Sequence, residues 1–192
     1  MLAFCCNLFS ENPPIERQVE SYLKGLKFVS AEFDQVTSSG ETYSGSFWMS
    51  KKKGTEVRIA YKTGLNQDIF ISGTSVTICE KNSKKEYRYS ISQTPIYSIL
   101  SGGIDLSKEK FEIIENSKEF LRLKLIKSSA FGGITVTLVF SKYEKSGNVK
   151  NLVAWIIDDG KTETLFSFDE SSLFVNDEKK IPNGIFEKTK GK

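Results

Sequence analysis

The sequence contains no histidine among its 192 residues. This absence removes histidine-based general acid–base catalysis, the serine and cysteine triads that depend on histidine, and most zinc sites. The chain also lacks the P-loop, the dinucleotide-binding G-x-G-x-x-G motif and the nucleophile-elbow motif G-x-S-x-G. We therefore expect no catalytic residues, no metal site and no cofactor, and we expect that the protein is not an enzyme.

Cysteine is scarce, and the spacing of the three cysteines indicates neither a metal site nor a disulfide. Cys5 and Cys6 are adjacent near the start of the chain, and Cys79 lies far away in the segment SVTICEK. This arrangement matches neither a metal-ligand spacing nor a disulfide framework. We interpret Cys79 as a small strand residue that stays a thiol.

The charge balance is nearly even, with 27 basic and 24 acidic residues and a formal charge of +3. A nucleic-acid-binding protein would carry a larger basic excess, so we expect no nucleic-acid partner. Local basic runs such as KKK, at 51–53, are typical of solvated turns. No later stretch is long and apolar enough to span a membrane, so the mature chain is expected to be soluble.

The first ten residues, MLAFCCNLFS, differ from the rest in composition. They resemble the end of the apolar region of a secretory signal, without its basic start or a clean cleavage site. We interpret residues 1–10 as a remnant of that signal and residues 11–192 as a single domain. Two alternatives stay open: an apolar end without a signal function, and lipidation of Cys5, although Phe4 precedes it where a small residue is needed.

One amphipathic helix is predicted in the segment NPPIERQVESYLKGLKF. Asn12 can cap this helix, and the two prolines suit its first turn. Its apolar residues recur at helical spacing on one face, namely Ile15, Val19, Tyr22, Leu23 and Leu26.

From there to about residue 168 the apolar residues alternate with period two, which indicates strands. Turn signals such as SSGE, EKNSKK and DDGK separate about eleven such segments: 29–36, 45–50, 56–61, 68–72, 75–80, 86–92, 110–114, 120–126, 134–140, 152–157 and 162–168. Short connections between many strands predict an antiparallel barrel or a strongly curved sheet. The alternation assigns one concave, apolar face to Val29, Ala31, Phe33, Phe47, Met49, Val57, Ile59, Tyr61, Ile69 and Ile71.

The segment TPIYSILSGGIDLS, at 94–107, interrupts the strands with one short apolar helix. Thr94 can cap it, Pro95 suits its first position, and two glycines at 102 and 103 end it. The apolar stripe of this helix consists of Ile96, Ile99 and Leu100. Such a helix either covers the concave face as a movable lid or simply completes the core.

Four pieces of the chain, in order, resemble the outer-membrane lipoprotein carrier family, LolA, and its α-proteobacterial members most. They are SAEFDQVTSSGETYSGSFWMSK, VRIAY, TPIYSILSGGIDL and AWIIDDGKTETLFSF, and the resemblance extends from about Val19 to Phe186. It implies a mainly β fold, an incomplete, half-open antiparallel β-barrel of about eleven strands with amphipathic helices as a lid. The ten concave-face residues would then line a lipid-binding cavity, and the lid would include Val19, Leu23, Ile96, Ile99 and Leu100.

The resemblance implies a monomeric periplasmic carrier that ferries acylated lipoproteins from the inner to the outer membrane. Its expected partners are an inner-membrane ABC lipoprotein-release complex and, where present, an outer-membrane receptor. Alternatives are a lipid-binding receptor or sensor of the same fold, a structural or interaction domain without a cavity, and, least favoured, an enzyme.

The chain departs from the family at one position. Members usually carry an Arg-Pro pair after the equivalent of FWMS, where the arginine latches the lid through hydrogen bonds to its backbone. Here Lys51 and Lys52 occupy these positions. Lysine keeps the charge but loses the planar fork of arginine, so Lys51 is either a weaker latch or a solvated side chain.

Overall fold

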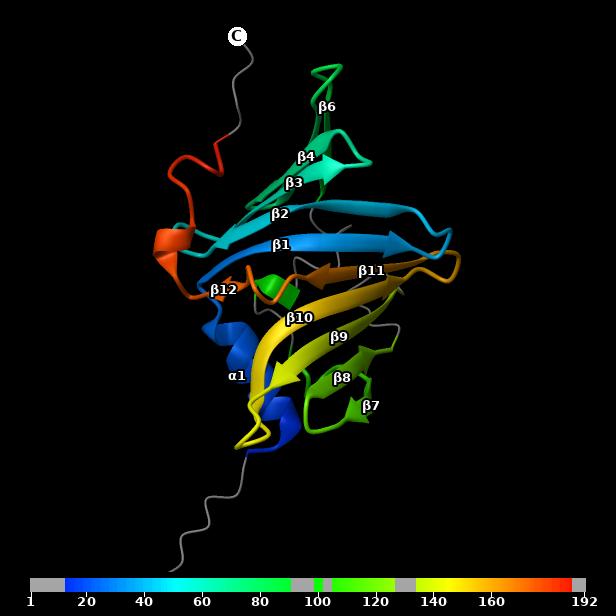
Figure 1. The fold of residues 1–192 in the computed structure, drawn as a ribbon, viewed down its shortest axis with the longest axis vertical. Coiled ribbons are helices and arrows are strands. Elements are labelled where there is room, and N and C mark those ends of the chain that lie inside the picture. Colours follow the sequence, from blue (N-terminus) through cyan, green and yellow to red (C-terminus); the bar gives the residue numbers. More distant parts are fainter. Residues whose placement is uncertain (1–12, 91–98, 102–104, 127–133, 188–192) are drawn as a thin grey trace, which may run out of the picture.

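A computed structural model describes residues 13–90, 99–101, 105–126 and 134–187. Its main feature is one antiparallel sheet with the strand order β6-β5-β4-β3-β2-β1-β11-β10-β9-β8-β7 (Figure 1). The predicted eleven strands are all present: β1 (Phe28–Thr37), β2 (Thr42–Ser50), β3 (Glu56–Thr63), β4 (Gln67–Ser72), β5 (Ser75–Glu80), β6 (Glu86–Ser90), β7 (Phe111–Asn116), β8 (Phe120–Leu125), β9 (Thr135–Lys142), β10 (Val149–Asp158) and β11 (Glu163–Phe168).

Two short elements follow in the C-terminal part. Strand β12 (Phe174–Val175) pairs with the start of β1, and the 3-10 helix η3 (Glu178–Lys180) follows it. A two-residue strand carries no periodicity, which is why the alternation pattern did not predict it.

The first and last long strands of the chain, β1 and β11, pair with each other in the middle of the sheet. The two edges, β6 and β7, are therefore consecutive in sequence, and among the described strands nothing pairs them with each other. The fold is mainly β and not closed, as predicted. The connection between the two edges contains the segment that interrupts the strands.

Helix α1 (Ile15–Gly25) lies beside β10 (Figure 1). It begins after Pro14, so the prolines precede the first turn, and the proposed cap Asn12 lies outside the described residues. The helix buries Val19 and Leu23, as its apolar face predicts. No helix among the described residues combines the length and hydropathy needed to cross a bilayer.

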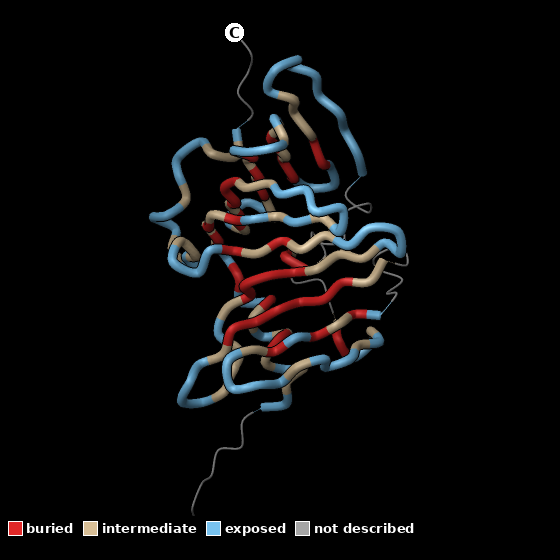
Figure 2. Tube along the Cα trace, turned by 45° about the vertical axis from the view of Figure 1, so that its right-hand side comes forward, coloured by how far each residue is buried: buried red, intermediate tan, exposed pale blue. Residues whose placement is uncertain are grey.

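The strand register confirms the predicted face. Phe47 of β2 lies opposite both Ala31 of β1 and Ile59 of β3, and the same parity continues into β4. Nine of the ten concave-face residues are buried, and Ile69 is half-buried against the same core. Buried positions run along the middle strands of the sheet (Figure 2).

The connection between β6 and β7 contributes to this core as well. Ile99 and Leu100 have helical backbone and are buried, and Leu106 is buried nearby. Ile96 and the capping residues of the predicted helix lie outside the described residues. We refer to α1 together with Ile99, Leu100 and Leu106 as the cover of the concave face.

Candidate functional site

An aromatic cluster forms the middle of the concave face. The Phe166 ring stacks between Phe33, at 4.2 Å, and Trp155, at 4.4 Å between ring centroids. Phe168 and Phe47 contact this stack edge to face. Stacked and edge-to-face rings pack favourably beyond their buried area, so this part of the face is a rigid apolar floor.

Sequence reasoning missed Trp155, Phe166 and Phe168. The alternation in TETLFSF was a usable signal for the two phenylalanines. Trp155 was not predictable in this way because β10 has irregular register with β9 between Leu152 and Ala154. An extra residue in a strand changes which positions share a face, so Leu152 and Trp155, three apart, both lie in the core.

Gly45 of β2 makes room for this floor. It lies opposite Phe33 on one side and Tyr61 on the other. A Cβ at this position would lie 2.3 Å from the carbonyl oxygen of Ala60 and 2.8 Å from the Phe33 ring. Glycine is therefore required here by close approach of backbone and ring.

Polar contacts fix α1 against β10. The main-chain N–H of Val149 donates to Gln18 Oε1 at 3.0 Å, and that of Leu152 donates to the Tyr22 hydroxyl at 2.9 Å. The Tyr22 ring also contacts Phe140 edge to face, with 5.6 Å between centroids. Burial raises the pKa of Tyr22 to about 12, although its bond to the Leu152 N–H acts in the opposite direction.

Glu20 joins the two parts of the cover. Its Oε1 accepts a hydrogen bond from the main-chain N–H of Leu106 at 2.9 Å. The connection between the sheet edges is thereby attached to α1, so a displacement of one part strains the other.

Lys51 reaches the last turn of α1. Its Nζ donates to the carbonyl oxygen of Leu23 at 3.2 Å, and its main-chain N–H donates to the carbonyl of Lys27 at 2.9 Å. The last carbonyls of a helix have no intrahelical donor, so Lys51 supplies one. Partial burial lowers the pKa of Lys51. The bond from Lys51 to the helix backbone is the contact expected of a latch. The role of Lys51 in lid movement stays a prediction.

The neighbouring lysines behave differently. Lys52 forms an exposed ion pair with Glu178 of η3, at 2.5 Å, and Lys53 is exposed. Only the first lysine of the triplet is directed at the helix.

Asn176 was not predicted, yet it binds the junction between α1 and β1 more extensively than Lys51 does. Its Oδ1 accepts from the main-chain N–H of Lys27 at 2.7 Å and of Phe28 at 3.3 Å, and its Nδ2 donates to the carbonyl of Gly25 at 3.0 Å. Its own main-chain N–H donates to the Phe28 carbonyl at 2.8 Å. Its φ of 59° is left-handed, a conformation that asparagine tolerates better than most residues.

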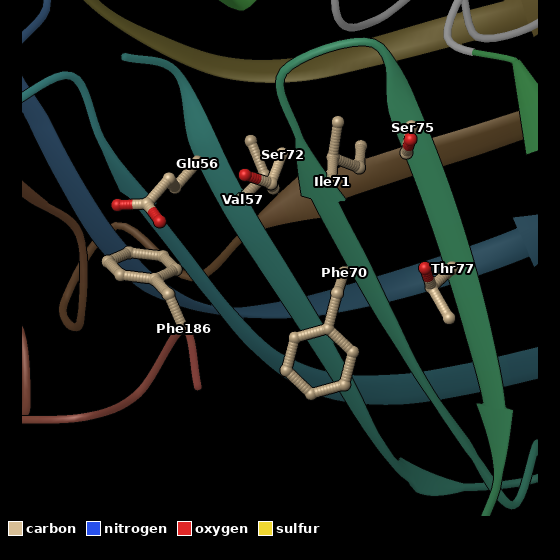
Figure 3. A pocket seen from close by; sticks show the side chains of 8 residues that line it. All are labelled: Glu56, Val57, Phe70, Ile71, Ser72, Ser75, Thr77 and Phe186. Atoms are coloured by element: carbon tan, nitrogen blue, oxygen red, sulfur yellow. The ribbon is translucent and has the colours of Figure 1, made fainter. Parts of the chain in front are cut away.

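A pocket of about 250 Å³ lies at the β3–β5 end of the sheet (Figure 3). Only Val57 and Ile71 among its lining residues belong to the predicted cavity; the others are Glu56, Phe70, Ser72, Ser75, Thr77 and Phe186. Pockets that hold drug-sized ligands have about 300–1,000 Å³. The concave face itself is covered, since Phe47, Met49, Leu123 and Phe140 are almost fully inaccessible.

The predicted site residues thus meet on one face, and four of the five predicted lid residues, Val19, Leu23, Ile99 and Leu100, lie in the same core cluster. Whether these residues hold lipid stays a prediction. Cys79 is half-buried in β5, opposite Asp68 of β4, while Cys5 and Cys6 lie outside the described residues. The proposed remnant of a signal, residues 1–10, lies outside them too.

Residues 24–186 match the family model described as "Outer membrane lipoprotein carrier protein LolA". The chain belongs to the LolA family. No curated protein matches it. A lipoprotein carrier family is consistent with a sheet that buries a continuous apolar face beneath a helix.

Solved structures match the chain at low identity, and the first of those below shares its fold. A Vibrio parahaemolyticus domain named for outer membrane lipoprotein sorting is 11% identical over 90% of this chain and 94% of its own, with a TM-score of 0.53. A LolA superfamily protein from Nitrosomonas europaea is 13% identical over 91% and 96%, with a TM-score of 0.47. The Mycobacterium tuberculosis lipoprotein LppX is 14% identical over 80% and 90%, with a TM-score of 0.45.

Proposed function

We propose that this protein is a periplasmic carrier that binds the acyl chains of lipoproteins on its concave face and ferries them from the inner to the outer membrane. The observation that carries this proposal is the continuous apolar inner face of an open sheet in a LolA-family chain, covered by α1 and by Ile99, Leu100 and Leu106. The carrier receives its cargo from an inner-membrane ABC release complex and delivers it to an outer-membrane receptor. It acts without catalysis.

The physical task explains why such a face is needed. Each buried CH₂ group is worth about 0.8 kcal/mol, so an acyl chain of a lipoprotein in water is unfavourable by on the order of 10 kcal/mol. A carrier must offset this cost and still release the chain. A cover whose own apolar side chains compete for the face lowers the net affinity, which makes release possible.

The cover is suited to this competition because it is small. The buried apolar side chains of the cover are mainly Val19 and Leu23 from α1 and Ile99, Leu100 and Leu106 from the connection. At about 25 cal/mol per Å² of apolar area, each fully buried side chain of this size contributes roughly 1.5–3 kcal/mol. Acyl chains that occupy the same face can match that total.

The test is binding of a fluorescent dipalmitoylated lipopeptide to the parent chain and to two variants. Leu100→Asn alters the cover, whereas the matched control Leu121→Asn alters a buried residue of β8 in the same core. We expect the parent to bind, Leu100→Asn to bind more tightly with a smaller loss in melting temperature than Leu121→Asn, and Leu121→Asn to melt far earlier.

Failure of the parent to bind the lipopeptide contradicts the carrier proposal. If Leu100→Asn melts as early as Leu121→Asn and binds no more tightly, the segment around Leu100 is ordinary core and the lid interpretation is wrong.

A further inference from the structure

Two main-chain N–H groups of β10 donate hydrogen bonds to side chains of α1. They belong to Val149 and Leu152, which donate to Gln18 and Tyr22. Both residues precede Ala154, the first β10 residue that pairs with β11. Irregular register with β9 follows each of them. The ladder is thus incomplete here, and α1 side chains take the place of a strand.

The Leu152 donor lies in apolar surroundings, and the Val149 donor is half-buried beside them. Leu152 is 3% exposed, Val149 packs against the core cluster, and the Phe140 side chain is fully buried. A buried main-chain N–H without an acceptor is strongly unfavourable, so nearly all such groups in folded proteins are paired. Anything that displaces α1 from β10 must therefore supply an acceptor for the buried Leu152 N–H or leave it unpaired, and the half-buried Val149 N–H loses its acceptor at the same time.

The next step rests on the proposed function, in which acyl chains take the place of the cover. A hydrocarbon chain has no acceptor and cannot replace Gln18 or Tyr22. The acyl linkages of a lipoprotein do have acceptors, because each ester or amide bond carries a carbonyl oxygen.

We propose that the main-chain N–H groups of Val149 and Leu152 form a binding site for the carbonyl oxygens of acyl ester or amide linkages, which exchange with Gln18 and Tyr22 when α1 moves away. The exchange conserves the number of hydrogen bonds in an apolar environment. The carrier therefore selects acylated molecules over apolar molecules of similar size, and the linkage end of the lipid lies next to β10.

The experiment compares two lipopeptides that share the peptide and the chain length and differ only in the linkage of their two chains. One carries ester bonds and the other carries ether bonds, which lack the carbonyl oxygen. We expect the unmodified protein to bind the diester about tenfold more tightly, the size expected when a buried donor loses its acceptor.

A pair of variants locates the effect. Val149→Pro removes one of the two N–H donors. Val149→Ala keeps this N–H and, like the proline variant, loses part of the packing of the valine side chain. We expect the ester preference to fall several-fold in Val149→Pro and to persist in Val149→Ala, with circular dichroism as the check on folding. Should Val149→Pro not fold, the diester and diether affinities of the unmodified protein decide.

Equal affinities of the two lipopeptides for the unmodified protein overturn this inference and leave the carrier function standing. An unchanged ester preference in folded Val149→Pro overturns the assignment to Val149. Absence of binding by both lipopeptides contradicts the carrier function itself.

Discussion

Asn176 holds the junction between α1 and β1 through a single side chain. It accepts two hydrogen bonds from Lys27 and Phe28 and donates one to Gly25. Asn176→Gly removes these three bonds but keeps the left-handed backbone, whose φ is 59°. We expect this variant to lose about 1–3 kcal/mol of unfolding free energy, measured by urea denaturation.

Asn176→Ala provides the comparison, because alanine loses the same bonds and also resists the left-handed conformation. It should be less stable than Asn176→Gly by a further 1–2 kcal/mol or so. A glycine variant as stable as the parent would show that the side chain of Asn176 does not hold the junction.

Tyr22 gives the closed arrangement a dependence on alkaline pH. Burial raises its folded-state pKa to about 12 from the ordinary value of 10.0. The folded state therefore favours the neutral phenol, and the stability that Tyr22 contributes is fully present below pH 10 and is lost as the pH rises toward 12. At 1.36 kcal/mol per pKa unit, this loss amounts to roughly 2–3 kcal/mol.

The measurement is the unfolding free energy of the parent and of Tyr22→Phe at several values between pH 9 and pH 11.5. Phenylalanine cannot ionise, so the free energy of Tyr22→Phe should fall less steeply with pH. Tyr61, whose pKa burial also raises to about 12, retains its own share in both proteins. Identical slopes for parent and variant would contradict the assigned burial of Tyr22.

At the scale of elements, period-two alternation predicted all eleven long strands and the shared face of the first four. This succeeded because β1 to β4 pair in nearly regular register. Residues that alternate along the sequence therefore also alternate between the two faces of the sheet. The same alternation does not hold in β10, to which no face was assigned, because irregular register puts Leu152 and Trp155 in the same core. Nothing in the letters LVAWII marks that irregularity.

The polar contacts of the cover could not be predicted from the sequence either. The Gln18 and Tyr22 bonds connect residues more than a hundred positions apart, and Asn176 contacts a junction about 150 positions away. Helical spacing placed Tyr22 on the apolar face of α1, but it could not indicate which backbone group the hydroxyl would meet. By contrast, the comparison with family members singled out Lys51, and the structure places its Nζ at the helix backbone.

The floor of the concave face depends on the absence of a side chain at Gly45. In Gly45→Ala, the new Cβ would lie 2.3 Å from backbone oxygen, which cannot move without distorting β3. We expect a loss of at least about 2 kcal/mol, seen as an earlier thermal transition.

Gly25 supplies the control, because a Cβ at the end of α1 would meet nothing within 4 Å. Gly25→Ala should be neutral or slightly stabilising, since alanine restricts the unfolded chain more than glycine does. Similar melting temperatures for both alanine variants would contradict the close packing at Gly45.

At the scale of the whole molecule, the strand order makes the pairing within the sheet independent of the cover. The first and last long strands, β1 and β11, pair in the middle of the sheet, and the connection that carries Ile99, Leu100 and Leu106 joins the two edges. Displacing the connection and α1 therefore breaks no pairing between neighbouring strands of the eleven-strand path. The sheet can keep its structure while acyl chains replace the cover on its concave face.

Hydrogen exchange of the amides in α1, measured with and without a saturating dipalmitoylated lipopeptide, tests the central claim most directly. Exchange reports the local opening of each segment, so it distinguishes a displaced helix from an intact sheet. If acyl chains replace the cover, the amides from Val19 to Leu23 should exchange at least about tenfold faster in the complex, while those of β9 stay protected. Amides of α1 that exchange equally fast or more slowly in the saturated complex would contradict the account, because the lipid would then bind without displacing the helix.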